Sequence, residues 1–159
     1  MRSLLTLLPV LLFGCQTSPS VKKVEAAVTT TPEALVSLER TACYGTCPIY
    51  GVSVLSDGTT RFEGKRHVKI TEPVEVKLEA AALEKLKAAF EKSGFAKWPD
   101  YTRTNVSDLP TVVLTYQGHT VRHSLGDDKA PPELTALEDE VDAIIGTDRW
   151  VKGTGAETQ

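Results

Sequence analysis

The fold is decided by residues 49–62, which read IYGVSVLSDGTTRF. On both sides of a Ser-Asp-Gly-Thr turn at 56–59, every second residue is apolar or strand-forming. These positions are Tyr50, Val52, Val54, Thr60 and Phe62. A period of two is typical of a strand with one buried face, and an Asp-Gly pair between two such runs is a strong signal for a tight turn. The stretch therefore predicts a β-hairpin.

Shorter strand patterns flank this hairpin. Upstream, Val36 and Leu38 alternate with Ser37 and Glu39, which predicts a strand of about six residues by its period. Downstream, residues 68–70 and 74–78 are short extended pieces. They are candidates for an added edge strand.

Two helices and a second hairpin complete the pattern. Residues 79–93 carry apolar side chains at helical spacing and end before Gly94, which suits a helix C-cap. Residues 112–116 and 121–125 alternate around Gln117-Gly118 and predict a second hairpin. A final helix is expected from Pro131-Pro132 to Ile145, with proline in its first turn and Asp127-Asp128 as its lead-in and N-cap.

The expected element order is strand, strand, strand, helix, strand, strand, helix. Hairpins dominate, and no strand–helix–strand unit repeats. The sequence therefore predicts an α+β fold, with a mainly antiparallel sheet and two helices packed on one face.

The N-terminus ends an apolar run with Leu12-Phe13-Gly14-Cys15, which resembles the lipobox of bacterial lipoproteins. Residues 1–14 are then a signal peptide, and Cys15 is the lipidated N-terminus. The polar, Pro-punctuated stretch up to residue 33 is expected to be a flexible tether. We expect one globular domain over 34–150, and a disordered tail over 151–159.

The charge balance narrows the class of partner. Removing Arg2 with the signal lowers the count of Lys and Arg from 18 to 17 against 21 Asp and Glu, a formal balance of −4. A mildly acidic chain without a basic run argues against nucleic-acid binding. The lipid would then hold the protein at the membrane, which we expect to be the outer membrane, facing the periplasm. The expected partner is an envelope protein or a cell-wall component.

With Cys15 consumed by lipid, Cys43 and Cys47 remain as a pair in an oxidising compartment and are candidates for a disulfide. Three intervening residues allow this bond only if the chain turns back, and Gly45 gives the freedom for such a turn. Closing so small a loop contributes only about 2 kcal/mol by chain entropy. A structural bridge is the favoured interpretation.

The segment CYGTCPIY at 43–50 resembles the signature of an uncharacterised bacterial domain family that is often found in lipoproteins. The resemblance covers most of residues 34–150. It implies the domain boundaries, but the family has no established activity to carry over.

Two other interpretations of the cysteine pair stay open. Thiol-redox sites of the thioredoxin kind use C-x-x-C before a helix, whereas this pair is one residue longer and precedes a strand. The spacing C-x-x-x-C-P with a distant histidine also resembles the copper site of the Sco family, and thiolates suit Cu(I). His67, His119 or His123 could complete that site. His119 and His123 lie about 13 Å apart along one expected strand, so they cannot both bind one metal.

No catalytic constellation is recognisable in the sequence. Asp100 and Asp108 stand in loops, and Asp108 is interpreted as a turn former. Ser107 lacks a nucleophile-elbow context, and no Gly-rich phosphate loop precedes a helix. We therefore expect a non-catalytic module that needs no cofactor or metal. Trp98 and Trp150 are expected to pack inside. The candidate binding surface surrounds the cysteine pair and comprises Tyr44, Gly45, Thr46, Pro48, Tyr50, Tyr101 and Asp108.

Overall fold

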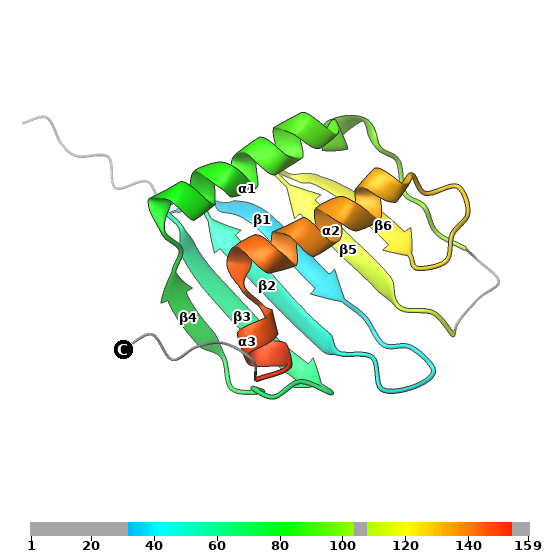
Figure 1. The fold of residues 1–159 in the computed structure, drawn as a ribbon, viewed down its shortest axis with the longest axis horizontal. Helices are drawn as coiled ribbons and strands as arrows, with labels where there is room; N and C mark the ends of the chain where they lie inside the picture. The colour runs from blue at the N-terminus through cyan, green and yellow to red at the C-terminus, as the bar shows by residue number, and fades with distance from the viewer. Residues whose placement is uncertain (1–31, 104–107, 154–159) are drawn as a thin grey trace, which may run out of the picture. The chain divides into compact units, whose positions relative to one another are not determined.

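A computed structural model describes residues 32–103 and 108–153 (Figure 1). The signal peptide, Cys15, nearly all of the tether, Ser107 and residues 154–159 lie outside these ranges. In the described ranges, no helix combines the length and the hydropathy that crossing a membrane requires.

A six-stranded antiparallel sheet forms one layer of the domain. Its spatial order is β4-β3-β2-β1-β5-β6. The strands are β1 (Ala34–Arg40), β2 (Ile49–Leu55), β3 (Thr59–Arg66), β4 (Val74–Lys77), β5 (Thr111–Tyr116) and β6 (His119–Ser124). Both predicted hairpins are confirmed as β2–β3 and β5–β6.

The helices form the second layer, and both long helices cover the same face of the sheet (Figure 1). They are α1 (Ala80–Ser93) and α2 (Pro132–Ile145). A short 3-10 helix, η1 (Phe95–Lys97), follows α1, and α3 (Asp148–Val151) follows α2. The predicted α+β class with two helices on one face is confirmed.

The core lies between these layers because strand alternation and helix periodicity both turn apolar side chains inward. Helix α1 contributes Leu83, Leu86, Ala89 and Phe90, and α2 contributes Leu134, Leu137, Val141 and Ile145. The glycines expected as helix C-caps, Gly94 and Gly146, both have a φ of 75°. That left-handed conformation suits glycine and ends both helices.

The first hairpin turn is held by a side chain as well as by the backbone. The Asp57 carboxylate accepts hydrogen bonds from the Thr59 amide at 2.9 Å and from the Lys77 ammonium at 2.9 Å. These two contacts lower the pKa of Asp57 to about 2, and the hydrogen bond from the Thr59 amide has the larger effect. The Lys77 contact joins the turn to β4.

Three local expectations differ from the structure. Residues 74–77 form the edge strand β4, so the order begins with four strands, but residues 68–70 form no strand. The amides of Lys69 and Ile70 instead donate to the Trp150 carbonyl at 3.1 and 3.0 Å. The N-cap of α2 is Pro131, without a side-chain hydrogen bond. Asp127 accepts from the Lys129 amide at 2.8 Å, because a two-residue turn satisfies it locally before the helix begins.

Both tryptophans pack inward as expected. Trp150, on α3, is buried, and its ring centroid lies 4.9 Å from that of Phe62 on β3. Trp98 is partly buried, with its ring edge-on to Phe95 at 6.0 Å. Helix α3 includes Val151, so the ordered chain continues through the boundary expected at residue 150.

Candidate functional site

The Cys43–Cys47 disulfide closes the connection between β1 and β2, with the two Cα atoms 5.8 Å apart. Within this turn the Gly45 amide donates to the Cys43 carbonyl at 2.9 Å. The Tyr44 amide donates to the backbone carbonyl of Asp108 at 3.1 Å. The turn is therefore fixed from inside by the disulfide and from outside by the segment that precedes β5.

A second pair of contacts fixes the base of the turn. The Thr41 amide donates to the Thr111 carbonyl at 3.0 Å, and the Thr111 amide donates to Thr41 Oγ1 at 2.8 Å. Since Thr111 begins β5, these contacts extend the pairing of β1 with β5 toward the disulfide.

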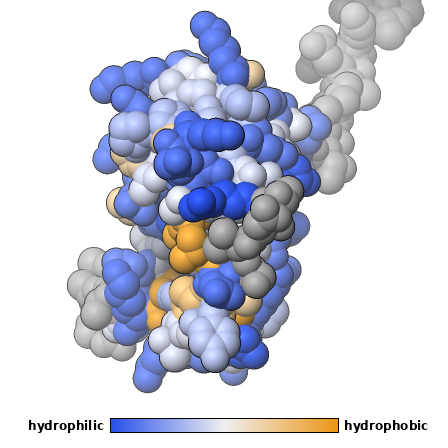
Figure 2. Space-filling view, turned by 90° about the vertical axis from the view of Figure 1, so that its right-hand side faces the viewer, coloured by the Kyte–Doolittle hydropathy of each residue, from blue (hydrophilic) through white to orange (hydrophobic). Residues whose placement is uncertain are grey.

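This end of the molecule carries the exposed large apolar side chains of the described residues, Tyr44 at 90% and Leu109 at 40%. They lie on adjacent segments, because the Tyr44 amide donates to the carbonyl of Asp108, the residue just before Leu109. Figure 2 shows one side of the domain, where hydrophobic residues gather in one area within a mostly hydrophilic surface. We call Tyr44, Leu109 and the disulfide the turn surface.

The other candidate surface residues fall into two groups. Gly45 and Thr46 are exposed beside Tyr44, and Pro48 is partly buried. Tyr50 is only 3% exposed, because alternation along β2 turns it toward the helices, so it does not belong to the turn surface. Tyr101 lies along the outer edge of β6, where its amide donates to the Arg122 carbonyl at 2.7 Å.

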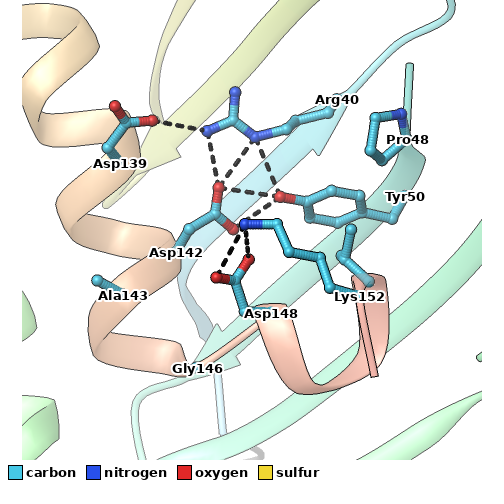
Figure 3. Close-up of a pocket in the computed structure, with 10 residues that line it drawn as sticks. Arg40, Pro48, Tyr50, Asp139, Asp142, Ala143, Gly146, Asp148 and Lys152 are labelled. Carbon is cyan, nitrogen blue, oxygen red and sulfur yellow. Dashed lines mark hydrogen bonds and ion pairs between the residues drawn. The ribbon is translucent and has the colours of Figure 1, made fainter. Parts of the chain in front are cut away.

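Tyr50 belongs to a charged cluster that lines an open pocket of about 480 Å³ (Figure 3). Arg40 donates to Asp142 Oδ2 from Nε at 2.9 Å and from Nη2 at 2.7 Å. The Tyr50 hydroxyl lies 2.8 Å from Asp142 Oδ1, and the Thr147 hydroxyl donates to the same oxygen at 2.6 Å. Pro48, at the end of the disulfide turn, lines the same pocket, so the turn and the cluster are adjacent.

Electrostatics keeps this cluster in one protonation state. Burial lowers the pKa of Arg40, but Asp142 and Tyr50 together outweigh burial and raise it above its ordinary value. Burial and the same carboxylate raise the pKa of Tyr50. At neutral pH the cluster therefore contains a guanidinium and a neutral phenol.

A buried pair lies farther along α2. His123 Nδ1 and Glu138 Oε1 are 2.9 Å apart, and the residues are 3% and 1% exposed. Burial raises the pKa of Glu138, with partial opposition from His123. Among the described residues, nothing hydrogen-bonds the second carboxylate oxygen, Oε2.

The charged cluster and the His123–Glu138 pair are built on one row of neighbouring strand residues that crosses the sheet. Arg40 is in register with Tyr50 on one side and with Val112 on the other, and Val112 is in register with His123. Glu138 and Asp142 are four residues apart on α2 and reach down to this row from one helix face.

The histidines suggested as metal ligands are held elsewhere. His119 Nε2 lies 3.1 Å from the Trp98 carbonyl, and the His123 ring faces Glu138. His67 has a φ of 56° in the bend after β3. In the portion of the chain that the structure describes, no group of three or more His, Cys, Asp or Glu residues could hold a metal ion.

A comparison with known protein families identifies the family of this domain. The model described as Domain of unknown function (DUF6438) matches residues 34–145, from the start of β1 to the end of α2. The chain belongs to the DUF6438 family. No curated protein matches the chain.

Sequence reasoning missed three residues of this DUF6438 domain that make its buried polar contacts, namely Arg40, Glu138 and Asp142. A signal was present in the final helix, where Glu138 and Asp142 stand among apolar residues at helical spacing. Carboxylates on an apolar face require buried partners. Their partners lie on other elements, as far away in sequence as Arg40 and Asp142, 102 residues apart.

Proposed function

We propose that this protein is a lipid-anchored module of the bacterial cell envelope that binds another envelope component without catalysis. The observation that carries the proposal is the exposure of Tyr44, 90%, on a turn held by a disulfide and by the Asp108 carbonyl. An exposed aromatic ring on a fixed turn provides contact area at low entropic cost. The binding surface is the turn surface.

The hydrogen bonds within the charged cluster beside the turn support a structural role for its side chains. Both oxygens of Asp142 already accept hydrogen bonds, from Arg40, Tyr50 and Thr147. A carboxylate so occupied is a poor general base. Instead, Arg40 and Tyr50 flank the turn in sequence, so Asp142 holds both strands from which the turn projects.

The anchor follows from the N-terminal sequence. The lipobox-like LFGC at 12–15 provides Cys15 as the lipid site, and the chain then reaches β1 at Ala34. The seven residues of β1 separate that entry point from the turn. At about 3.3 Å per residue this separation is roughly 23 Å. The turn therefore follows the end of β1 that lies farther from Ala34.

The anchor and the binding role are tested separately. Cells producing the full chain should incorporate labelled palmitate into it, and Cys15→Ser should abolish the label. A secreted, unlipidated chain with Cys15→Ser should co-sediment with the total envelope of the producing bacterium. Tyr44→Ala should lower that binding at least about 30-fold if Tyr44 is an interface hot spot. Equal binding by both chains would refute the turn surface as the binding site.

The redox and copper interpretations predict different behaviour of Cys43 and Cys47. Thiol alkylation with intact mass measurement across graded reducing potentials distinguishes them. A structural bridge stays oxidised well below the cytosolic potential. Easy reduction, or uptake of one Cu(I) per chain, would replace the structural interpretation.

A further inference from the structure

We propose that the groove between α1 and α2 is a dimerisation surface, on which a second copy of this chain docks with its own groove facing the first. This inference goes beyond the proposed function and does not involve the turn surface. It rests on the opposite charges of the two rims of the groove, on the absence of partners for these charges among the described residues, and on their spacing.

The groove lies on the outer side of the helix layer, where Figure 1 shows α1 and α2 side by side in front of the sheet. Its volume is about 440 Å³. The floor is built from Ala88 and Ala89 of α1 and from Ala136 and Leu137 of α2. Because three of these four side chains are alanine, another pair of helices can approach closely.

The two helices run antiparallel. Helix α1 begins after the edge strand β4 and ends at η1, from which the chain reaches Tyr101 beside the other edge strand, β6. Helix α2 begins after β6 and ends before α3, where Trp150 packs against Phe62 of β3. The last turn of α1, with Lys92, therefore lies level with the first turn of α2, with Glu133.

Each rim of the groove carries one sign of charge. Lys85 and Lys92 of α1 form the basic rim, and Glu133 and Glu140 of α2 form the acidic rim. All four residues are exposed. The two charges of each rim are seven residues apart, which is two helical turns or about 10.5 Å on one helix face. Both rims therefore have the same spacing, and the antiparallel packing places Lys85 level with Glu140.

The four rim charges have no partner within the described part of the chain. None of them forms an ion pair or a hydrogen bond there. On the same helix α1, Lys87 does form such a contact, with Glu84 at 2.8 Å. The groove thus presents two rows of opposite charge that the domain itself leaves unpaired.

A second copy satisfies both rows at once. A two-fold axis along the groove places α1 of each copy over α2 of the other. Lys85 then faces the second copy's Glu140, Lys92 faces the second copy's Glu133, and each contact occurs twice. An axis across the groove would instead place lysine over lysine and glutamate over glutamate. Charge therefore selects the first arrangement, and the equal spacing of the rims fits a contact of this surface with itself.

The size of this surface predicts a weak dimer. Each helix has 14 residues and is therefore about 21 Å long. Two such helices side by side present roughly 400 Å² on each copy, or about 800 Å² in all. Contacts below about 1,200 Å² are typical of transient complexes. We therefore expect a dissociation constant of about 100 µM.

The test reverses the charge of one rim at a time in the unlipidated full chain with Cys15→Ser. The acidic-groove variant carries Lys85→Glu and Lys92→Glu. The basic-groove variant carries Glu133→Lys and Glu140→Lys. Sedimentation equilibrium from about 10 µM to about 1 mM gives the dissociation constant of each chain, and of an equimolar mixture of the two variants. Circular dichroism checks that each variant is folded.

The matched control carries Arg66→Glu and Lys69→Glu. Both residues are exposed, they lie at the end of β3 and in the bend after it, and neither lines the groove. This control changes the net charge by as much as the acidic-groove variant does. It therefore separates the contact in the groove from a general effect of net charge.

The parent and the control should dimerise with a dissociation constant of about 100 µM. Each groove variant alone should have a dissociation constant at least about tenfold higher, because all four contacts become repulsive. The mixture should recover the parent value within about threefold, because every glutamate rim then meets a lysine rim. Recovery in the mixture cannot come from variants that fail to fold.

A parent that stays monomeric up to about 1 mM would overturn the proposal. So would a dimer that survives both charge reversals, or one that the mixture does not restore. A monomeric parent whose co-sedimentation with the envelope is lost in the groove variants would identify a foreign protein as the occupant of the groove. Tyr44→Ala should leave the dimer within about twofold, since the turn surface is not part of it. Loss of the dimer in Tyr44→Ala would place the contact at the turn and overturn the groove, whereas envelope binding that depends on Tyr44 tests the proposed function alone.

Discussion

Replacing Asp142 by Ala tests the cluster that holds the disulfide turn to α2. The side chains of Arg40 and Asp142 are only 19% and 16% exposed, so the substitution leaves a poorly solvated guanidinium without its closest carboxylate. Removing one partner of a buried ion pair costs about 3–5 kcal/mol. Because Arg40 retains some solvent and a contact with Asp139 at 3.5 Å, we expect a loss of about 2–4 kcal/mol.

The assay is urea unfolding at pH 7, followed by far-UV circular dichroism and by tryptophan fluorescence, since Trp150 on α3 lies beside the cluster. The expected loss corresponds to a fall in Tm of roughly 10 °C for a domain of this size. Arg40→Met in the same background removes the stranded charge. The double variant should therefore show a coupling energy of about 1–3 kcal/mol.

A matched control lies in the same strand. Glu39 precedes Arg40 but points to the opposite face, where its contact with Lys65 is 2.6 Å long between groups 46% and 51% exposed. Glu39→Ala should cost less than about 1 kcal/mol. The reasoning fails if Asp142→Ala costs no more than Glu39→Ala, or if the effects of Arg40→Met and Asp142→Ala are additive.

Three further predictions concern the buried pair, the glycines and the disulfide. Since burial raises the pKa of Glu138, the folded state holds more protons than the unfolded state between the two pKa values, and stability must fall as pH rises above about 4.3 through the raised pKa. Urea unfolding from pH 4 to 8 should show a smaller decline in Glu138→Gln than in the parent, and parallel curves would contradict this. Gly64→Ala should cost about 1–3 kcal/mol, because its Cβ would collide with the Ile70 carbonyl. Gly51→Ala, with nothing within 4 Å of the new Cβ, should be neutral or stabilising by about 0.5 kcal/mol; equal losses at both glycines would refute the steric argument. Replacing both turn cysteines by Ser should cost about 2 kcal/mol without unfolding the domain. A loss of all secondary structure by circular dichroism would show that the bridge does more than fix the turn.

The fold was largely predictable because its determinants are local. The Asp57-Gly58 turn joins two alternating runs, and Gly94 and Gly146 stand where both helices must end. The segment at 68–70 was not predictable from its own residues. Its amides pair with the Trp150 carbonyl, about 80 positions later, so its conformation depends on tertiary contacts.

The candidate site divides in the same way. The Cys43–Cys47 disulfide was predicted as the favoured interpretation from the cysteine count and the expected oxidising compartment, and Gly45 allows the turn that it requires. The cluster depends on Asp142, whose partners come from β1, β2 and the residue before α3. Strand alternation alone predicts that the Tyr50 side chain points inward. Tyr50 was nevertheless assigned to the candidate binding surface, because it belongs to the CYGTCPIY segment.

The single line that joins Tyr50, Arg40 and His123 across the sheet has a consequence for how the strands choose their partners. Apolar residues recur at every second position of β1, β2 and β5, so a slip by two residues would still bury apolar side chains. Such a slip would remove the basic partners from beneath Glu138 and Asp142 and strand both carboxylates in the core. The two acidic residues of α2 therefore discriminate between alternative strand alignments that hydrophobicity alone would accept.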